Sequence, residues 1–185
     1  MTDIIQSFDF AVLNKIQELM KCGFLDKLMP FVSTAAGVVL WVALGLILLC
    51  FKKVRFNGIA LLSAFLLTVV VTEFLIKPIF MRERPFMLNP EYTLLVSEPF
   101  GSSFPSAHSS TSFAAAVQLF GISRKAGILG IIAAGMVAFS RLYLYVHFPS
   151  DVMAGIFIGV ALGIAVMLMS KKIRFKFSEQ RQVEQ

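Results

Sequence analysis

The chain has only two histidines, His108 and His147, and a carboxylate, Asp151, follows the second of them by four residues. Side chains four apart meet across one turn of a helix, so Asp151 is predicted to reach the imidazole of His147. A carboxylate at one ring nitrogen orients an imidazole and leaves the other nitrogen free to attack or to take a proton. His108 is then available to protonate a leaving oxygen. The two histidines therefore predict nucleophilic chemistry assisted by a general acid.

Three cations, Lys77, Arg84 and Arg141, predict that the substrate of this chemistry is an anion such as a phosphate. Arginine donates paired hydrogen bonds that fit phosphate oxygens, and lysine adds a point charge. Ser106 lies where a loop is expected to turn into a helix, and we expect it to be the N-cap, with its hydroxyl also available to phosphate. The N-terminus of a helix presents free N–H groups and a positive dipole, which together bind anions.

The composition shows what kind of protein must position these groups. Hydrophobic residues make up 57% of the 185 residues and charged residues 15%, whereas a soluble domain is roughly 45–50% apolar and about 25% charged. These values exclude an ordinary soluble domain and a disordered chain. The net charge of +6 does not indicate a nucleic-acid partner, because no module with interleaved aromatic and basic residues is present. We expect a single integral membrane domain over residues 1–185.

Apolar segments predict an all-α membrane bundle with five or six transmembrane helices. Five segments are read as spans, and they cover residues 28–51, 56–76, 108–122, 126–146 and 152–170. Residues 4–21 alternate apolar and charged positions at helical spacing, so region 1–22 is predicted to be an amphipathic helix in the membrane interface. If this helix crosses the membrane instead, the number of spans is six.

Clusters of Lys and Arg predict the orientation of the bundle. They lie at residues 52–55, at 124–125 and in the tail 171–185, and the alternation of spans brings all three to one side. The positive-inside rule makes that side the cytoplasm. The loop 77–106 and the turn 147–151 are then extracytoplasmic, so that both histidines and the three cations meet at one face of a plasma (inner) membrane. Charged residues in or beside spans are costly and are functional candidates for that reason.

Three segments resemble the signatures of the type 2 phosphatidic acid phosphatase (PAP2) superfamily. They are KPIFMRERP at 77–85, PSAH at 105–108 and SRLYLYVHFPSD at 140–151, in the order that the family has. The resemblance implies a membrane helical bundle that acts as a lipid phosphatase and needs neither metal nor cofactor. Its catalytic motifs fall within 77–151.

The same resemblance implies a role for each matching residue. His147 would form a phosphohistidine, Asp151 would orient it, and His108 would be the general acid for the leaving group. The phosphoryl oxygens would be held by cations and by the start of a helix, namely by Lys77, Arg84, Arg141, Ser106 and the backbone N–H groups of Ala107 and His108. Pro85 and Ser140 are supporting motif positions. A ring of fixed cations is physically sufficient for phosphoryl transfer, which depends mainly on positioning and charge stabilisation.

Ala107 departs from the family, which usually has glycine there. If the position needs a positive φ, alanine costs about 1 kcal/mol, and if the conformation is ordinary, alanine is harmless. We favour the second interpretation because the family uses the backbone N–H at this position.

Several further residues lie near the motifs without matching them. Glu73 precedes Lys77 by four residues, and either it pairs with Lys77 and aims it at the phosphate or it makes a polar contact between helices. Arg82 and Glu83 are interpreted as interfacial charges, and Tyr143 and Tyr145 as part of an interfacial aromatic belt. Gly155, Gly159 and Gly163 recur every four residues, which is typical of close helix packing.

The predicted activity is hydrolysis of a phosphate or pyrophosphate from a lipid head group at the extracytoplasmic surface. From what small bacterial members of the family commonly do, undecaprenyl pyrophosphate, converted to undecaprenyl phosphate, ranks first. Phosphatidylglycerol phosphate and phosphatidic acid follow, and lipid A phosphates come next. A lipid phosphotransferase and a non-catalytic lipid-binding or transport protein remain as rivals, and the oligomeric state stays open.

Overall fold

The computed structural model describes the backbone of residues 2–183 and their side chains except those of residues 2, 3, 36 and 176–183. The end of the expected basic tail, from residue 176 onward, therefore lies outside the described side chains. Eleven elements follow one another, all of them helical: α1 (Thr2–Met20), α2 (Gly23–Thr34), η1 (Ala35–Val39), α3 (Leu40–Cys50), α4 (Arg55–Val69), η2 (Val70–Ile76), α5 (Lys77–Phe80), α6 (Pro85–Leu88), α7 (Ala107–Leu119), α8 (Arg124–Tyr143) and α9 (Pro149–Val183). The two η elements are π-helical turns inside longer helices. The all-α class is confirmed for the described part of the chain.

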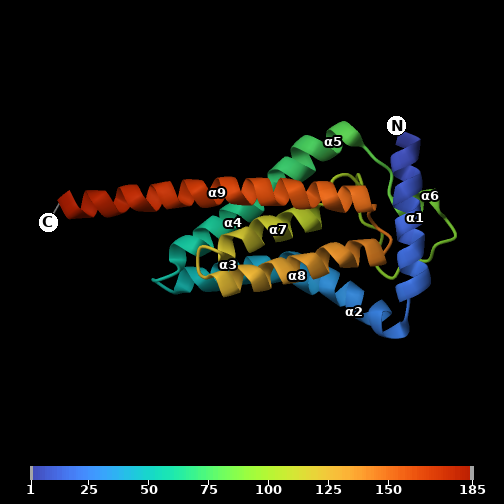
Figure 1. Cartoon of the computed structure of the whole chain (residues 1–185), viewed down its shortest axis with the longest axis horizontal. Coiled ribbons are helices and arrows are strands. Elements are labelled where there is room, and N and C mark those ends of the chain that lie inside the picture. Colours follow the sequence, from blue (N-terminus) through green and yellow to red (C-terminus); the bar gives the residue numbers. More distant parts are fainter. Residues whose placement is uncertain (1, 184–185) are drawn as a thin grey trace.

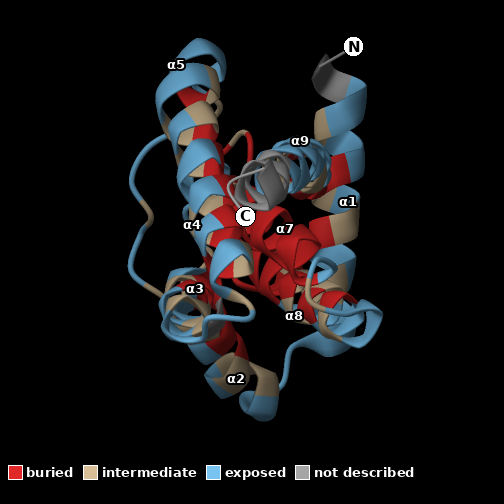
Figure 2. Cartoon of the chain, turned by 90° about the vertical axis from the view of Figure 1, so that its left-hand side faces the viewer, coloured by how far each residue is buried: buried red, intermediate tan, exposed pale blue. Residues whose placement is uncertain are grey.

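Four helical stretches of the described residues are long and apolar enough to cross a membrane: Gly23–Cys50, Arg55–Leu88, Arg124–Tyr143 and Pro149–Phe175. The expected span at 108–122 forms α7, which has 13 residues and is therefore about 20 Å long. That length falls short of the ~30 Å apolar core of a bilayer. Its residues 109–119 are all buried, and Figure 2 shows α7 enclosed by the other helices. This segment is thus a buried central helix, and the four candidate spans pack around it. It still carries the chain from the loop 81–106 at one end of the bundle to the connection 120–123 at the other.

Small residues let α9 approach α7 closely. A Cβ atom placed on Gly159 would lie 2.2 Å from the carbonyl oxygen of Ser110, and one on Gly155 would lie 2.6 Å from that of Ser106. At Gly163 the corresponding distance, to the carbonyl oxygen of Ala114, is 3.0 Å. The interpretation of the three glycines as a close-packing stripe is confirmed. Because Ser106 is the N-cap of α7, this contact also fixes the position of the motif at 105–108 along α9.

The substitution Gly159→Ala is expected to lower the thermal unfolding midpoint in detergent. The new methyl group meets a backbone carbonyl that cannot move aside, and overpacking of this kind costs about 1–3 kcal/mol. Gly135→Ala is the matched control, because its Cβ would meet nothing within 4 Å and alanine is about 1 kcal/mol better than glycine in a helix. Equal midpoints for the two variants would contradict the close contact.

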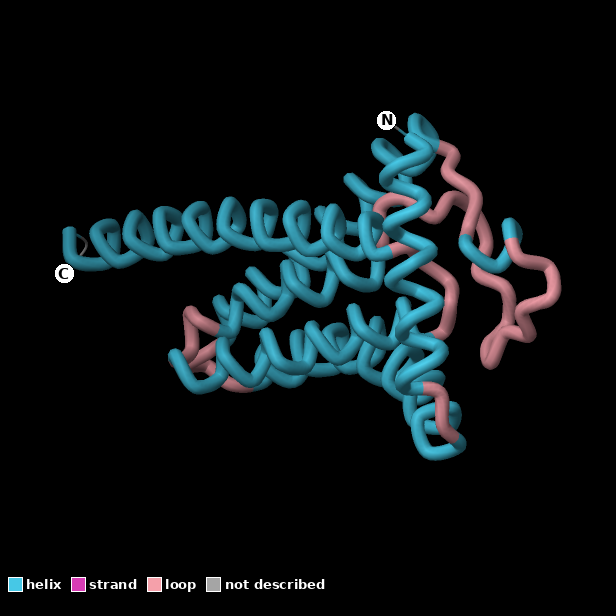
Figure 3. Tube along the Cα trace, turned by 45° about the vertical axis from the view of Figure 1, so that its right-hand side comes forward, coloured by secondary structure: helices cyan, strands magenta, loops and turns pink. Residues whose placement is uncertain are grey.

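The first helix lies across one end of the bundle rather than along it (Figures 1 and 3). Apolar side chains on one part of its surface, including Ile4, Phe8 and Leu19, are exposed, whereas Asp9 and Leu13 are completely buried against the bundle. The helix expected for residues 4–21 is thus present as α1, and α1 is not among the four candidate spans. Its position in the membrane interface stays a prediction.

The two ends of the bundle differ in what they carry. The connections at 51–54 and 120–123 and the far end of α9 lie at one end, which we call the basic end (Figure 1). The loop 81–106, the turn 144–148 and α1 lie at the other, which we call the site end (Figures 1 and 3). The alternation predicted from the basic clusters is therefore reproduced in the arrangement of the chain.

Candidate active site

The structure brings the predicted cations and both histidines together at the site end. His108 interacts electrostatically with four other groups of the set, namely Arg141, His147, Lys77 and Arg84. They come from different elements: Lys77 starts α5, Arg84 precedes α6, His108 lies in the first turn of α7, Arg141 in the last turn of α8, and His147 in the turn before α9. Residues 77–147 thus converge on one site through packing around the short central helix.

His147 is held as a neutral imidazole with one nitrogen available. Its Nδ1 lies 2.8 Å from the carbonyl oxygen of Ser103, and its Nε2 lies 3.3 Å from Nη1 of Arg84. A carbonyl only accepts and a guanidinium only donates, so these partners assign the proton to Nδ1 and a lone pair to Nε2. Burial lowers the pKa of His147 from 6.5 to about 3, and Arg84 and Arg141 act in the same direction while Asp151 opposes them. Nε2 therefore keeps its lone pair at neutral pH, which is the form that nucleophilic attack requires.

Asp151 does not bond the imidazole directly, contrary to the expectation. Its Oδ2 lies 3.7 Å from Nδ1 of His147, which is longer than a hydrogen bond. Instead, Oδ2 accepts from the hydroxyl of Ser103 and from the backbone N–H of Phe148, the latter at 2.8 Å. Asp151 thus positions Ser103, and the carbonyl of Ser103 in turn positions His147. Nothing in the motif spacing indicates Ser103.

Arg84 is buried and fastens two loops to each other. Its Nη1 donates to the carbonyl oxygen of Val146 at 2.9 Å, and its Nε donates to that of Gly101 at 3.0 Å. Gly101 has a φ of 77°, a conformation that glycine adopts without strain. Two further carbonyls of the same loop, those of Phe100 and Ser102, accept from Nη2 at 3.2 and 3.3 Å. The guanidinium therefore sets the position of His147 as well as contributing charge.

Arg141 carries the only buried side-chain nitrogen or oxygen among the described residues that has no hydrogen-bond partner, its Nε. Its Nη1 donates to the hydroxyl of Ser33 in α2, a residue that the motifs do not indicate. Leaving a buried charged donor unsatisfied is costly. A phosphate oxygen beside His108 would satisfy it. The neighbouring motif residue, Ser140, is buried and donates to a carbonyl of its own helix, that of Val137, at 2.6 Å.

The start of α7 differs in one respect from the expectation. Ser106 is the N-cap residue, but its side chain makes no capping bond to the helix. Its hydroxyl instead accepts from that of Ser109 at 2.9 Å. Ala107 is not among the described residues with positive φ, which besides glycine are Met81 and Tyr145. Alanine is therefore unstrained here, as we favoured, and the first N–H groups of the helix remain free of intrahelical partners.

Gly37 approaches His108 closely, which the sequence did not indicate. A Cβ atom on Gly37 would lie 2.9 Å from Cδ2 of the imidazole. Gly37 belongs to the π-helical turn η1, and such turns are frequent at functional sites. The first span therefore contributes two contacts to the site, Gly37 to His108 and Ser33 to Arg141.

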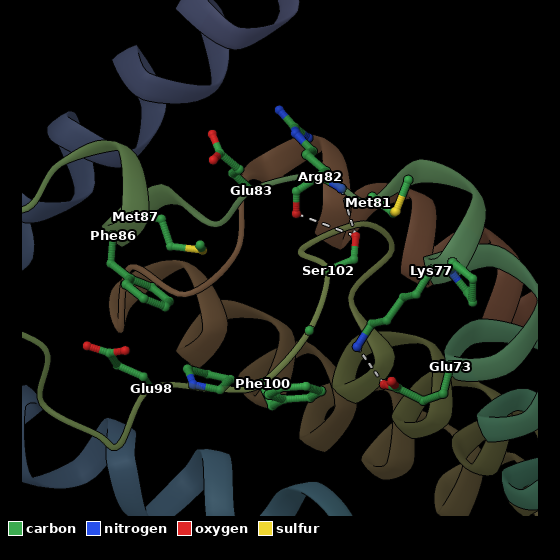
Figure 4. Close-up of a pocket in the computed structure, with 13 residues that line it drawn as sticks. Glu73, Lys77, Met81, Arg82, Glu83, Phe86, Met87, Glu98, Phe100 and Ser102 are labelled. Carbon is green, nitrogen blue, oxygen red and sulfur yellow. Dashed lines mark hydrogen bonds and ion pairs between the residues drawn. The ribbon is translucent and has the colours of Figure 1, made fainter.

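Glu73 pairs with Lys77, at 2.6 Å between Oε1 and Nζ. Glu73 lies in the second π-helical turn, η2, and Lys77 is the first residue after it. Both line a cavity of about 640 Å³ at the site end, together with Ser102 and Phe100. Figure 4 shows the pair on one side of this cavity, facing the loop that contains Ser102. The first of the two alternatives for Glu73, pairing with Lys77, is the one that the geometry supports.

The substitution Glu73→Gln is expected to lower kcat/KM by about tenfold, because the ammonium loses the partner that orients it near the phosphate. Steady-state kinetics on a lipid phosphate in detergent measures the effect. Glu83→Gln serves as the control, since Glu83 lines the same cavity but makes no ion pair with Lys77. Unchanged rate and KM for Glu73→Gln would contradict the orienting role.

Three side chains near the motifs have surroundings other than those predicted. Tyr143 and Tyr145 are buried, at 0% and 1% exposure, and their hydroxyls bond Asp26 at 2.6 Å and Asn14 at 3.2 Å. The prediction of an interfacial aromatic belt is wrong for both, because they fasten α1 and α2 to the end of α8. Arg82 is an ion-pair partner of Asp151 rather than a solvated charge. The adjacent Glu83 is exposed, as expected.

Comparison with known proteins identifies a family for this chain. The family model described as PAP2 superfamily matches residues 57–175. An undecaprenyl-diphosphatase of Sulfolobus acidocaldarius is 38% identical over 157 residues, which are 83% of this chain and 75% of that protein. Undecaprenyl-diphosphatase BcrC of Bacillus subtilis is 27% identical over 159 residues, 81% of this chain and 77% of the relative.

Two solved structures share the fold. The crystal structure of a transmembrane PAP2 type phosphatidylglycerolphosphate phosphatase from Bacillus subtilis has a TM-score of 0.77 at 25% identity, covering 92% of this chain and 88% of that one. The crystal structure of Aquifex aeolicus LpxE has a TM-score of 0.74 at 26% identity, covering 85% and 93%. With three ordered signatures, a helical membrane bundle that converges on them, and a family match over most of that bundle, the chain belongs to the PAP2 superfamily.

Proposed function

We propose that this chain is a membrane lipid phosphatase that converts undecaprenyl diphosphate to undecaprenyl phosphate through a phosphohistidine at His147. The observation that carries the proposal is the buried, neutral imidazole whose Nε2 lies among fixed cations. The site is assigned to the extracytoplasmic face of the plasma membrane, because the basic clusters lie at the opposite end of the bundle. There the polyprenyl chain stays in the bilayer while the head group enters the site.

In the first step Nε2 of His147 attacks the terminal phosphorus, and the bond from phosphorus to the bridging oxygen breaks. The negative charge of the bound phosphate favours the protonated form of His108, which gives its proton to the leaving oxygen. The modified imidazole becomes positively charged. The carbonyl of Ser103, 2.8 Å from Nδ1, and the carboxylate of Asp151, at 3.7 Å, stabilise that charge.

In the second step water attacks the same phosphorus while neutral His108 takes a proton from it. The P–N bond breaks, His147 regains its lone pair, and inorganic phosphate leaves. Lys77, Arg84, Arg141 and the free N–H groups at the start of α7 stabilise the phosphoryl oxygens in both steps.

The choice of substrate is supported by relatives that are named undecaprenyl-diphosphatase in Sulfolobus acidocaldarius and Bacillus subtilis. Phosphatidylglycerol phosphate is the second candidate, because the Bacillus subtilis phosphatidylglycerolphosphate phosphatase shares the fold over 92% of this chain. Lipid A phosphates come third, on the likeness to a lipid A 4'-phosphatase of Bacteroides thetaiotaomicron, 30% identical over 145 residues. Transfer of the phosphoryl group to a second lipid instead of water is the rival reaction.

Phosphate release from a panel of lipids in detergent, with EDTA present, tests the proposal. Undecaprenyl diphosphate, phosphatidylglycerol phosphate, phosphatidic acid and a lipid A phosphate are compared at equal concentration, with thin-layer analysis of lipid products. We expect the highest kcat/KM for undecaprenyl diphosphate, no dependence on divalent metal, and free phosphate as the product. A requirement for metal would contradict the mechanism, and a phosphorylated second lipid would favour the phosphotransferase.

A further inference from the structure

A buried carboxylate ties the first helix to the site. Asp9 in α1 has no exposed surface. Its two oxygens accept three hydrogen bonds from the site end, from Nη2 of Arg82 at 2.7 Å, from the backbone N–H of Ser150 at 2.9 Å and from the hydroxyl of Ser150 at 2.5 Å. Burying a carboxylate is expensive unless it is paired and fully hydrogen-bonded. The side chain of Asp9 is therefore held in a specific set of polar contacts and is not a solvated charge on the surface of α1.

Arg82 connects this carboxylate to a residue of the third motif. One guanidinium nitrogen, Nη2, binds Asp9, and the other, Nη1, donates to Oδ1 of Asp151 at 2.6 Å and to the hydroxyl of Ser150 at 2.7 Å. The guanidinium also lies over the ring of Phe148, with 4.2 Å from its carbon to the ring centroid. Its orientation is thus fixed by two buried carboxylates and one aromatic face.

These contacts continue to the imidazole. Asp151 accepts from the hydroxyl of Ser103, and the carbonyl of Ser103 lies 2.8 Å from Nδ1 of His147. An unbroken series of polar contacts therefore runs from Asp9 in α1, through Arg82, to the candidate nucleophile. These contacts join three segments, α1, the loop 81–106 and residues 147–151, so no segment alone can keep the ring in place.

We propose that Asp9 and Arg82 are positioning residues for phosphoryl transfer, and that α1 belongs to the catalytic apparatus because it supplies Asp9. The inference rests on the proposed role of His147. Without Asp9, Nη2 of Arg82 loses its partner, and the side chain, which is 24% exposed, is free to turn toward solvent. Asp151 then loses the donor at Oδ1, and the segment with Ser103 and His147 loses its support. Misplacement of a reacting group by about 1 Å costs up to about 100-fold in rate.

The variant Asp9→Asn tests this, because it keeps the size and an acceptor oxygen but removes the charge that pairs with Arg82. We expect kcat per folded molecule to fall by about 10- to 30-fold, with KM within about twofold. The rate at which radiolabelled phosphate appears on the enzyme should fall by the same factor. Inhibition by vanadate, a phosphate analogue, should stay within about twofold, since the cations of the phosphate site are untouched.

Three further variants separate positioning from a purely structural role. Glu18→Gln removes a charge from the same helix, where Glu18 forms an exposed pair with Lys15, and should leave kcat unchanged. Arg82→Gln and the double variant Asp9→Asn/Arg82→Gln should have kcat values within about twofold of each other, because both break the same series of contacts. Ser150→Ala removes the hydroxyl that donates to Asp9 and accepts from Arg82. It should lower kcat by about threefold and serves if Asp9→Asn does not fold.

Wild-type kcat per folded molecule in Asp9→Asn, or in Ser150→Ala where it is used, would overturn the inference. So would a loss that merely follows the fraction of folded protein. The proposed function fails separately, when phosphate release survives the loss of His147, whatever Asp9 does.

Discussion

Replacing His147 by asparagine is expected to lower kcat for lipid dephosphorylation by at least about 10⁴-fold, since removal of a nucleophile leaves only binding and charge stabilisation. Asparagine is the informative replacement. Its amide can still donate to the carbonyl of Ser103, where Nδ1 now lies at 2.8 Å, but it has no atom at the position of Nε2. The variant therefore separates loss of the attacking nitrogen from collapse of the surrounding loop.

The measurement combines turnover with trapping of the covalent intermediate. Wild-type enzyme quenched in alkali after mixing with radiolabelled lipid should carry an alkali-stable, acid-labile phosphate, and His147→Asn should carry none. The circular dichroism and thermal midpoint of the variant should match those of the wild type. Phosphohistidine in the variant, or turnover within about tenfold of wild type, would move the covalent step to another residue.

Much of this site could be predicted from the sequence because its chemistry is concentrated in few residues. With only two histidines and charges excluded from the apolar segments, each remaining polar residue was a candidate. Alternation of spans predicted that Lys77, Arg141 and His147 share an end, and the structure places them there. The length of the apolar segment at 108–122 did not show whether its helix faces lipid. The helix that it forms, α7, is buried in the interior of the bundle and is rich in small residues.

What could not be predicted are contacts between segments that no periodicity relates. Asp9 and Arg82 are 73 positions apart, and Ser33 and Arg141 are 108 apart. Their pairing follows from how α1 and α2 fold back on the bundle. Motif spacing suggested that Asp151 binds His147 directly, but the carbonyl of Ser103, from the loop 81–106, lies at the ring instead. In each case the local sequence pattern identified a charged side chain, but its partner depended on tertiary packing.

Arg141→Gln is expected to lower kcat/KM by about 10³-fold and to weaken vanadate inhibition by a similar order, because loss of one donor to a developing oxyanion costs about 10²–10³-fold and this variant loses a charge as well. The reason lies in the buried Nε without a partner, which an anion in the site would satisfy. Ser33 fixes the other end of the guanidinium through Nη1, so the free edge keeps one orientation before substrate binds. Such preorganisation stabilises the transition state without a cost of reordering.

A graded series distinguishes charge from geometry at this position. Arg141→Lys keeps the charge but not the planar pair of donors, and its kcat/KM should fall by about 10²-fold. Ser33→Ala keeps the whole guanidinium and removes only the hydroxyl that anchors it, so its kcat/KM should fall by about tenfold. Arg124→Gln is the matched control, since Arg124 is an exposed arginine on the same helix α8 at the basic end, and its kinetics should equal those of wild type. If Arg141→Lys performed as well as wild type, the guanidinium would act as a simple charge and its fixed free edge would have no catalytic role. If Arg141→Gln lost less than about tenfold, the phosphate would be held by Lys77 and Arg84 without it.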